Sequence, residues 1–536
     1  MRLLICAALS TCLLACSHTP PDLRPSASAG DGTSPEIAEL DIAALQALMA
    51  DGELTSRALT QAYLGRIAAI DDAGPTLNAV IETNPDALDE AATLDAERRA
   101  GRVRGPLHGI PVLLKDNIDA TPMVNSAGSL ALAGHRPEAD APLVRALREA
   151  GAVILGKTNL SEWANFRSTR SSSCWSARGG QTRNPYVLDR SPCGSSSGTG
   201  AAIAASLAAA GVGTETDGSV ICPAAMTGLV GIKPTVGLIG RSGIIPIAQS
   251  QDTAGPMARS VADAALLLGV MASASDPADP ATAAAATHRL ADYTDVLDPA
   301  ALDGARIGVL RDAMGRNPEL DAAMERAITA MKAAGATVVD SEIPTAGKWG
   351  DAEYTVLLYE FKDGLNRYLR DSGAAVDSLE ALIAFNTAHA AREMPWFGQE
   401  ILLQAQEKGP LTETAYRDAA RKARQLAGPQ GIDAALERHD LDALIAPSTG
   451  PAWLIDLVNG DHSGGAGYGA PAVAGYPSVT VPIGNVHGLP VGAVLMGPKW
   501  SEAELIGLAY ALEQATHART PPRFLPTIPL LSASAE

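Results

Sequence analysis

Three polar segments of this chain place a lysine and several serines where they could support nucleophilic catalysis. Residues 115–117 read Lys-Asp-Asn, residues 194–198 Gly-Ser-Ser-Ser-Gly and residues 214–219 Thr-Glu-Thr-Asp-Gly-Ser. Hydrolysis of an amide needs an activated oxygen, donors for the developing oxyanion and an acid for the departing nitrogen. Because these segments can supply a base, a proton relay and a nucleophile without a histidine, they predict amide hydrolysis.

The lysine of the first segment follows an apolar stretch, residues 110–114, that is typical of a short buried strand. An apolar setting disfavours the ammonium form, so Lys115 could act as a neutral base. In the third segment, consecutive N–H groups around Gly218 could converge on an oxyanion, with Ser219 placed to attack the same carbonyl. An ordinary surface lysine and a plain turn are the alternatives for these two segments taken singly.

The serine loop permits a second interpretation, because residues 194–198 also match Gly-x-Ser-x-Gly. Ser196 would then be the nucleophile of an α/β-hydrolase-type esterase. That interpretation requires a strand running into the loop, whereas residues 189–193 are typical of coil, and it requires a downstream histidine. His462 and His487 are the least poor candidates for that histidine.

Composition and charge limit the classes of protein to consider. The chain has 536 residues, of which 46% are hydrophobic, and this is enough for a large core. A formal net charge of −19 would repel phosphate backbones, so no nucleic-acid partner is expected. For the same reason, an amidotransferase subunit acting on charged transfer RNA is a weaker alternative.

The amino-terminal residues are typical of an export signal. Residues 1–15 contain one early charge and an apolar stretch, and they end before Cys16 as a lipoprotein signal peptide does. The prediction is lipidation at Cys16, a flexible tether over residues 16–35 and a periplasmic or membrane-tethered bacterial protein. An ordinary cleaved signal peptide is the alternative, and a lipid-tethered solute-binding protein would explain the same segment without catalysis.

Three cysteines remain in the folded body, Cys174, Cys193 and Cys222. Their spacing does not resemble a zinc site, so no metal is predicted and small buried side chains are favoured. One disulfide among the three is the alternative.

Helical and strand-like segments alternate along most of the chain, which predicts an α/β fold with a sheet covered on both faces. Residues 344–438 are richer in helical pattern, and strands are expected again at 444–447, 478–482 and 491–496. Since no linker divides the body, we expect one large domain over residues 36–530, with two domains as the alternative.

Taken together, the motifs resemble those of the amidase signature family, which include Lys-Asp-Asn, a Gly/Ser-rich loop and a later Gly-Ser segment in this order. The resemblance implies a single α/β/α domain with a mixed central sheet. It makes Ser219 the nucleophile, Ser195 a bridging serine on a cis peptide bond after Gly194, and Lys115 the terminal base. It also implies an oxyanion hole from the N–H groups of residues Thr216, Asp217, Gly218 and Ser219, and no cofactor.

The sequence departs from the family pattern at Cys193, Ser197 and Asp217, where glycine is usual. These loops are most similar to those of bacterial members that release ammonia from C-terminal peptide amides, so the expected ligand is a small amide or peptide amide. The substrate-binding candidates are Ser196, Cys174 and Trp175, although Trp175 could equally be a core residue. The sequence makes no prediction of oligomeric state.

Overall fold

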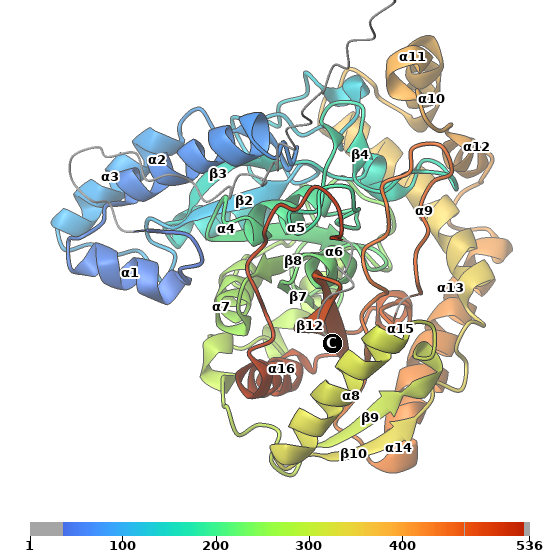
Figure 1. Cartoon of the computed structure of the whole chain (residues 1–536). Helices are drawn as coiled ribbons and strands as arrows, with labels where there is room; N and C mark the ends of the chain where they lie inside the picture. Colours follow the sequence, from blue (N-terminus) through green and yellow to red (C-terminus); the bar gives the residue numbers. More distant parts are fainter. Residues whose placement is uncertain (1–35, 466, 530–536) are drawn as a thin grey trace, which may run out of the picture. The chain divides into compact units, whose positions relative to one another are not determined.

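The computed structural model describes residues 36–465 and 467–529, and its central element is an 11-stranded sheet. The strands of this sheet are β1 (Val80–Thr83), β2 (Pro111–Lys115), β3 (Val153–Thr158), β6 (Ala210–Glu215), β7 (Val230–Lys233), β8 (Thr253–Ala258), β9 (Arg306–Leu310), β10 (Thr337–Ser341), β11 (Ala443–Pro447), β12 (Ser478–Val486) and β13 (Leu489–Met496). Their order is β1-β3-β2-β6-β8-β7-β12-β13-β11-β9-β10 (Figure 1). A separate small hairpin pairs β4 (Trp175–Ser176) with β5 (Gly180–Gln181).

The sheet is mixed, with parallel strands toward both ends and antiparallel strands between them. Strand β2 runs parallel to both β3 and β6, and β9 runs parallel to both β10 and β11. Strands β8, β7, β12 and β13 connect these groups through antiparallel pairs. Because β2 and β6 are parallel neighbours, the residues that follow them meet at one edge of the sheet.

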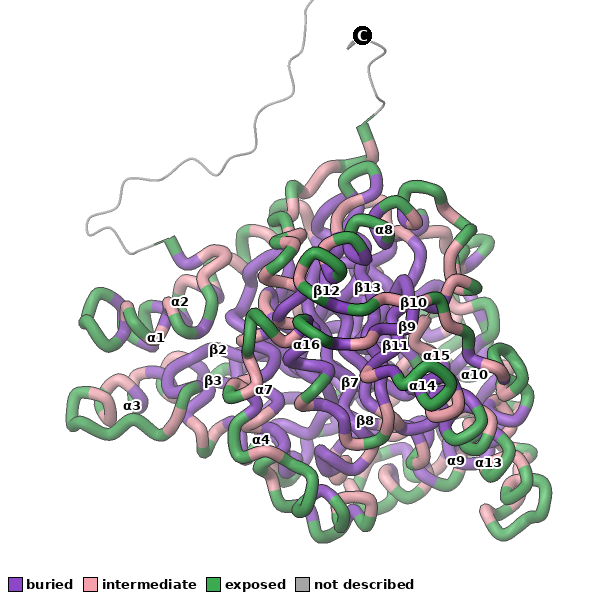
Figure 2. The backbone as a smooth tube through the Cα atoms, turned by 90° about the horizontal axis from the view of Figure 1, so that it is seen from below, coloured by how far each residue is buried: buried purple, intermediate pink, exposed green. Residues whose placement is uncertain are grey.

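Helices pack against the sheet and against one another. They are α1 (Ile42–Ala50), α2 (Ser56–Arg66), α3 (Ala87–Arg99), α4 (Pro142–Glu149), α5 (Ser197–Ala204), α6 (Ile221–Met226), α7 (Val261–Ala272), α8 (Pro318–Ala333), α9 (Gly350–Asp371), α10 (Leu379–Ala388), α11 (Ala390–Glu393), α12 (Glu400–Gln406), α13 (Thr414–Ala427), α14 (Ala434–His439), α15 (Gly469–Ala474) and α16 (Glu502–Thr516). Helices α4, α7, α16 and α8 contact one another in series, and α5 packs on α6. The central strands are buried, whereas the outer helices expose one side (Figure 2).

The predicted α/β class with a mixed sheet is confirmed, and local signals account for several helix starts. The Thr55 side chain accepts the N–H of Ala58 at the start of α2, and Asn317 caps α8 just before a proline at the first helical position. The small residues over 201–210 predict a helix after the serine loop, but α5 begins earlier, at Ser197, and ends at Ala204, and residue 210 already belongs to β6. Strands β1, β7 and β8 were not predicted.

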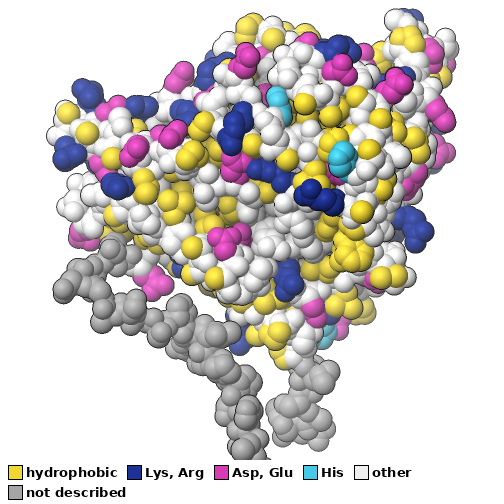
Figure 3. All heavy atoms as spheres, turned by 90° about the horizontal axis from the view of Figure 1, so that it is seen from above, with side chains coloured by type: hydrophobic (Ala, Val, Ile, Leu, Met, Phe, Trp, Pro, Cys, Tyr) yellow, Lys and Arg dark blue, Asp and Glu magenta, His cyan; other side chains and the backbone are white. Residues whose placement is uncertain are grey.

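The described residues from Ile37 onward belong to one compact unit. Acidic and basic side chains are interspersed on the face that Figure 3 shows. Within residues 36–465 and 467–529, no helix is both long and apolar enough to cross a bilayer. The predicted signal peptide, residues 1–15, the lipidation site Cys16 and the tether, residues 16–35, lie outside the described residues.

Candidate active site

Lys115 is the last residue of β2 and is completely buried. Its Nζ donates to Ser195 Oγ at 2.7 Å, to Thr214 Oγ1 at 2.8 Å and to the Thr214 carbonyl at 3.1 Å. These three acceptors match the three N–H bonds of an ammonium group. In the neutral amine the lone pair can instead accept the Ser195 hydroxyl proton, so the site accommodates both protonation states.

The environment of this lysine favours the neutral amine. Burial lowers the pKa of Lys115 to about 7, although the carboxylates of Glu215 and Asp252 act in the opposite direction. A lysine that loses its proton near neutral pH can serve as a general base at that pH.

Ser195 follows a cis peptide bond after Gly194, as the family resemblance implied. Its side chain is fully buried, and its carbonyl accepts the N–H of Ser161 at 3.1 Å. A Cβ on residue 194 would lie 2.2 Å from Ser161 Oγ, which explains why glycine occupies this site. The loop therefore holds the Ser195 hydroxyl against the Lys115 amine.

Ser219 ends the loop that follows β6, the parallel neighbour of β2. Its carbonyl accepts the N–H of Ser196 at 3.2 Å, so the two serine-bearing loops are in direct contact. Its side chain keeps 7% of its surface exposed, whereas Ser195 keeps none. Gly218 has a φ of 78°, and a Cβ there would lie 2.1 Å from Cε2 of Tyr468. Glycine is thus required for the turn that presents Ser219.

The N–H groups of this loop divide into two sets. The Glu215 carboxylate accepts the N–H groups of Val220 at 2.7 Å and Ile221 at 2.9 Å. Burial raises the pKa of Glu215, whereas Lys233 and the N–H groups of residues 221, 220 and 218 lower it. In the part of the chain that the structure describes, the N–H groups of residues 216, 217 and 219 donate no hydrogen bond. The N–H of Gly218 interacts with Glu215. The oxyanion hole formed by the four N–H groups of residues 216–219 stays a prediction.

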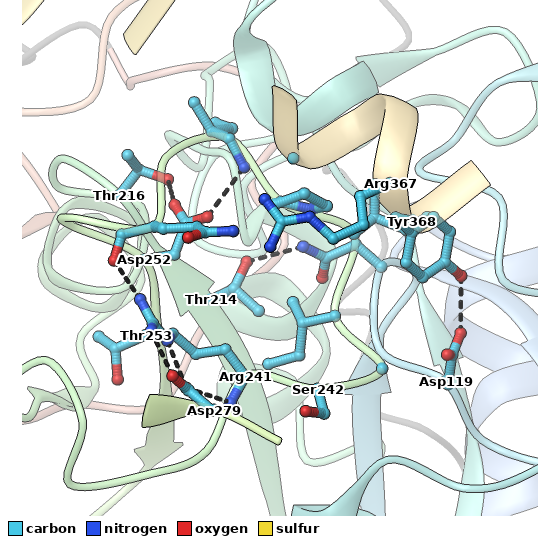
Figure 4. Close-up of a pocket in the computed structure, with 18 of the residues that line it drawn as sticks. Asp119, Thr214, Thr216, Arg241, Ser242, Asp252, Thr253, Asp279, Arg367 and Tyr368 are labelled. Carbon is cyan, nitrogen blue, oxygen red and sulfur yellow. Dashed lines mark hydrogen bonds and ion pairs between the residues drawn. The ribbon is translucent and has the colours of Figure 1, made fainter. Parts of the chain in front are cut away.

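A cavity of about 460 Å³ lies beside these loops and is lined by Asn117, Thr214 and Thr216, among others (Figure 4). Asn117 Nδ2 donates to Thr214 Oγ1 at 3.0 Å, and its Oδ1 is buried without a partner in the described chain. The cavity is also lined by Tyr368, whose hydroxyl donates to Asp119 Oδ1, and by Arg241, which forms an ion pair with Asp279. Thr214 therefore joins the cavity wall to Lys115.

The other predicted site residues lie around the same loops but are buried. Ser196 Oγ donates to the Thr214 carbonyl at 3.1 Å and accepts its N–H at 3.2 Å. This engagement leaves Ser196 unsuited to the role of esterase nucleophile. Cys174 is fully buried and Trp175 is 6% exposed, with its ring 5.4 Å from that of Phe397. Substrate binding by these three residues stays a prediction.

The cysteines form one disulfide, between Cys193 and Cys222, while Cys174 remains a buried thiol. All three side chains are buried, as expected, and the alternative of one disulfide among them is confirmed. Three cysteines allow three different pairs, so spacing alone could not choose the partners. No group of three or more His, Cys, Asp or Glu side chains in the described ranges is arranged to hold a metal ion.

Two features of the site were missed by sequence reasoning. Thr214 was part of the third motif, yet its hydroxyl and carbonyl contacts with Lys115 depend on strand pairing. The second feature is a pair of carboxyl groups, Asp217 on the loop that follows β6 and Glu353 on α9. Burial raises the pKa of Glu353, and the carboxylates of Glu353 and Glu215 act to raise that of Asp217, whose side chain is exposed. Gln251 donates to Glu353 at 3.1 Å.

Comparisons with known proteins agree with this geometry. The sequence model of the family described as Amidase matches residues 58–506. A putative amidase of Arthroderma benhamiae is 38% identical over 94% of this chain and 86% of its own, and a probable amidase of Arabidopsis thaliana is 39% identical over 91% and 92%. The crystal structure of the native peptide amidase from Stenotrophomonas maltophilia superposes on this chain with a TM-score of 0.87. The two sequences are 60% identical, and the match covers 91% of this chain and 99% of that protein's chain.

These comparisons contradict the predicted localisation. The curated relatives that match most of the chain include fungal and plant proteins, and none of the similarities indicates a signal peptide or a bacterial lipoprotein. The prediction of an exported periplasmic or membrane-tethered protein was therefore wrong. It depended on a short apolar stretch before Cys16, and such a stretch can occur for other reasons.

Proposed function

Because this chain belongs to the amidase signature family and is a C–N hydrolase, we propose that it releases ammonia from C-terminal peptide amides. The main support for this chemistry is the 2.7 Å distance between Lys115 Nζ and Ser195 Oγ. Ser195 follows the cis peptide bond from Gly194. The substrate class is supported by the 60% identity to the Stenotrophomonas maltophilia peptide amidase. A small amide or a peptide amide is the proposed ligand.

In the proposed mechanism, neutral Lys115 accepts the proton of Ser195 while Ser195 takes the proton of Ser219. The Ser219 oxygen attacks the carbonyl carbon, and loop N–H groups stabilise the oxyanion. Ser195 returns a proton to the leaving nitrogen, so the C–N bond breaks, ammonia departs and an acyl-enzyme remains. Water then attacks the ester through the same relay and regenerates Ser219. These steps need no metal or organic cofactor.

A substrate screen tests this proposal. The purified chain is assayed for ammonia or acid production with peptide amides, the corresponding peptide methyl esters, free glutamine and simple aliphatic amides. We expect peptide amides to have the highest kcat/KM. A higher kcat/KM for glutamine or aliphatic amides would refute the substrate class, and ester turnover without ammonia release would favour an esterase.

Two serine variants test the mechanism in the same assay. Ser219→Ala removes the nucleophile and should abolish turnover. Ser273→Ala removes an exposed hydroxyl at the carboxyl end of α7 and is the matched control. Retained activity in Ser219→Ala would remove Ser219 as the nucleophile. A mass increase equal to the acyl group, found on the Ser219 peptide of the wild type, would identify the intermediate.

A further inference from the structure

The disulfide between Cys193 and Cys222 joins the two loops that carry the proposed catalytic serines. Cys193 lies two residues before Ser195, and Cys222 lies three residues after Ser219. The cysteines are 29 residues apart in sequence, and their Cα atoms are 5.9 Å apart. The disulfide is therefore a covalent bridge across the place where Ser195 must receive a proton from Ser219.

One end of this bridge is firmly held. Cys222 lies in the first turn of α6, which packs on strands β7, β12 and β13. The Cys222 N–H donates to the carbonyl of Gly218 at 2.8 Å, so the cysteine is also tied to the turn that presents Ser219. With only 1% of its surface exposed, Cys222 is a fixed anchor.

The other end is held in an unusual backbone conformation. Cys193 has a φ of 60°, in the left-handed region that non-glycine residues seldom adopt. Its N–H donates to Ser191 Oγ at 3.1 Å, and its carbonyl accepts the thiol of Cys174 at 3.1 Å. Without the bridge, rotation of Cys193 to a relaxed φ would move Gly194 and Ser195 with it.

The remaining direct backbone link between the loops is weaker than a covalent bond. Among the described residues it is the hydrogen bond from the Ser196 N–H to the Ser219 carbonyl at 3.2 Å, and the two bonds between Ser196 Oγ and the backbone of Thr214 add to it. Hydrogen bonds of this kind are individually weak and can lengthen, so they constrain the spacing of the two hydroxyl groups less tightly than a covalent bridge does. Proton relays depend steeply on such spacing.

We propose that Cys193 and Cys222 are positioning residues, whose disulfide sets the separation of Ser195 and Ser219 and makes turnover depend on the redox state of this pair. The proposal rests on the proposed function of the two serines. A dithiol reductant such as dithiothreitol would open the bridge in two steps. One thiolate attacks a cysteine sulfur to give a mixed disulfide, and the second thiolate closes the reductant ring, leaving two cysteine thiols and oxidised dithiothreitol.

Burial of the disulfide will make its chemical reduction slow. The main test therefore removes the disulfide by mutation and compares the wild type with the double variant Cys193→Ala/Cys222→Ala. We expect kcat for a peptide amide to fall about tenfold to a hundredfold with KM changed less than twofold, since small misplacements of catalytic groups act on the chemical step. Prolonged dithiothreitol treatment should lower the wild-type kcat and leave that of the double variant unchanged. A double variant with kcat within twofold of the wild type would overturn the proposal.

A stability-matched control separates positioning from general destabilisation. Ile328→Ala creates a cavity in α8, at a side chain that is 2% exposed, and leaves both loops untouched. If this control loses kcat as the double variant does at an equal shift in denaturation midpoint, the disulfide has only a structural role and the proposal fails.

The reaction of Ser219 with a fluorophosphonate probe provides a second readout that does not depend on the substrate. If the wild type releases no ammonia, the proposed function fails while the labelling rate still tests the bridge. Slower labelling in the double variant supports the positioning role, and an unchanged rate overturns it.

Discussion

Replacing Lys115 with methionine should abolish activity and at the same time stabilise the protein near neutral pH. The amine is completely buried, and burial lowers its pKa from 10.5 to about 7. In the unfolded chain the lysine is protonated up to much higher pH. Between these two pKa values the unfolded state binds more protons than the folded state, so the stability of the wild type rises with pH in this window.

The size of the expected change in unfolding free energy follows from the folded-state and unfolded-state pKa values of Lys115. At pH 7 the lowered pKa of Lys115 costs the folded state about 4 kcal/mol, and at pH 9 about 2 kcal/mol. Methionine removes this cost but leaves Ser195 Oγ without its partner, a loss of about 1–2 kcal/mol. We therefore expect Lys115→Met to be about 3 kcal/mol more stable than the wild type at pH 7. This advantage should shrink by about 2 kcal/mol by pH 9.

Urea unfolding of both proteins at pH 7, 8 and 9 measures this difference, since other titrating groups are shared. Lys348→Met, which removes an exposed lysine, is the matched control. An advantage of Lys115→Met that is constant or grows with pH would refute the reasoning, because the buried amine would then carry its charge in the folded protein. Ammonia release should fall by about 10²–10⁴-fold in the same variant, as general-base catalysis is lost.

Three further predictions follow from the same geometry. The kcat/KM of the wild type should rise with pH up to a plateau, with its limb near 7, because Lys115 must lose its proton; a flat profile between pH 5 and 9 would contradict this. Gly218→Ala should lose most activity and about 1–3 kcal/mol of stability, because the added Cβ would meet the ring of Tyr468. Ammonia release measures the loss of activity, and thermal unfolding measures the loss of stability. Removing the Cys193–Cys222 disulfide should cost about 3–4 kcal/mol for a loop of 29 residues, and an unchanged urea midpoint would contradict that value.

Much of the chemistry could be predicted from the sequence because the motifs are local. The lysine at the end of an apolar strand, the serine after a glycine and the second serine after a turn are each set by a few neighbouring residues. The same locality applies to the starts of α2 and α8, where the side chains of Thr55 and Asn317 cap the helix. These features require no knowledge of distant contacts.

What could not be predicted depends on contacts between distant segments. Strands β7 and β8 are short and rich in small residues, and they become strands only through pairing with their neighbours. Asp217 and Glu353 are far apart in sequence, and only the approach of α9 to the loop that follows β6 brings their carboxyl groups together. The choice of Cys193 and Cys222 among three cysteines likewise required three-dimensional proximity.

The pairing of β2 with β6 has a consequence for how such a catalyst can diversify. The proposed base, Lys115, is built into the sheet interior, where neighbouring strands fix it, whereas the proposed nucleophile, Ser219, lies on a loop and α9 lines part of the cavity. Exchange of α9 and the segment that leads into it should therefore alter which molecules are accepted while leaving the proton-transfer apparatus intact. For protein engineers, this separation defines a replaceable module and a part of the scaffold that should be left alone.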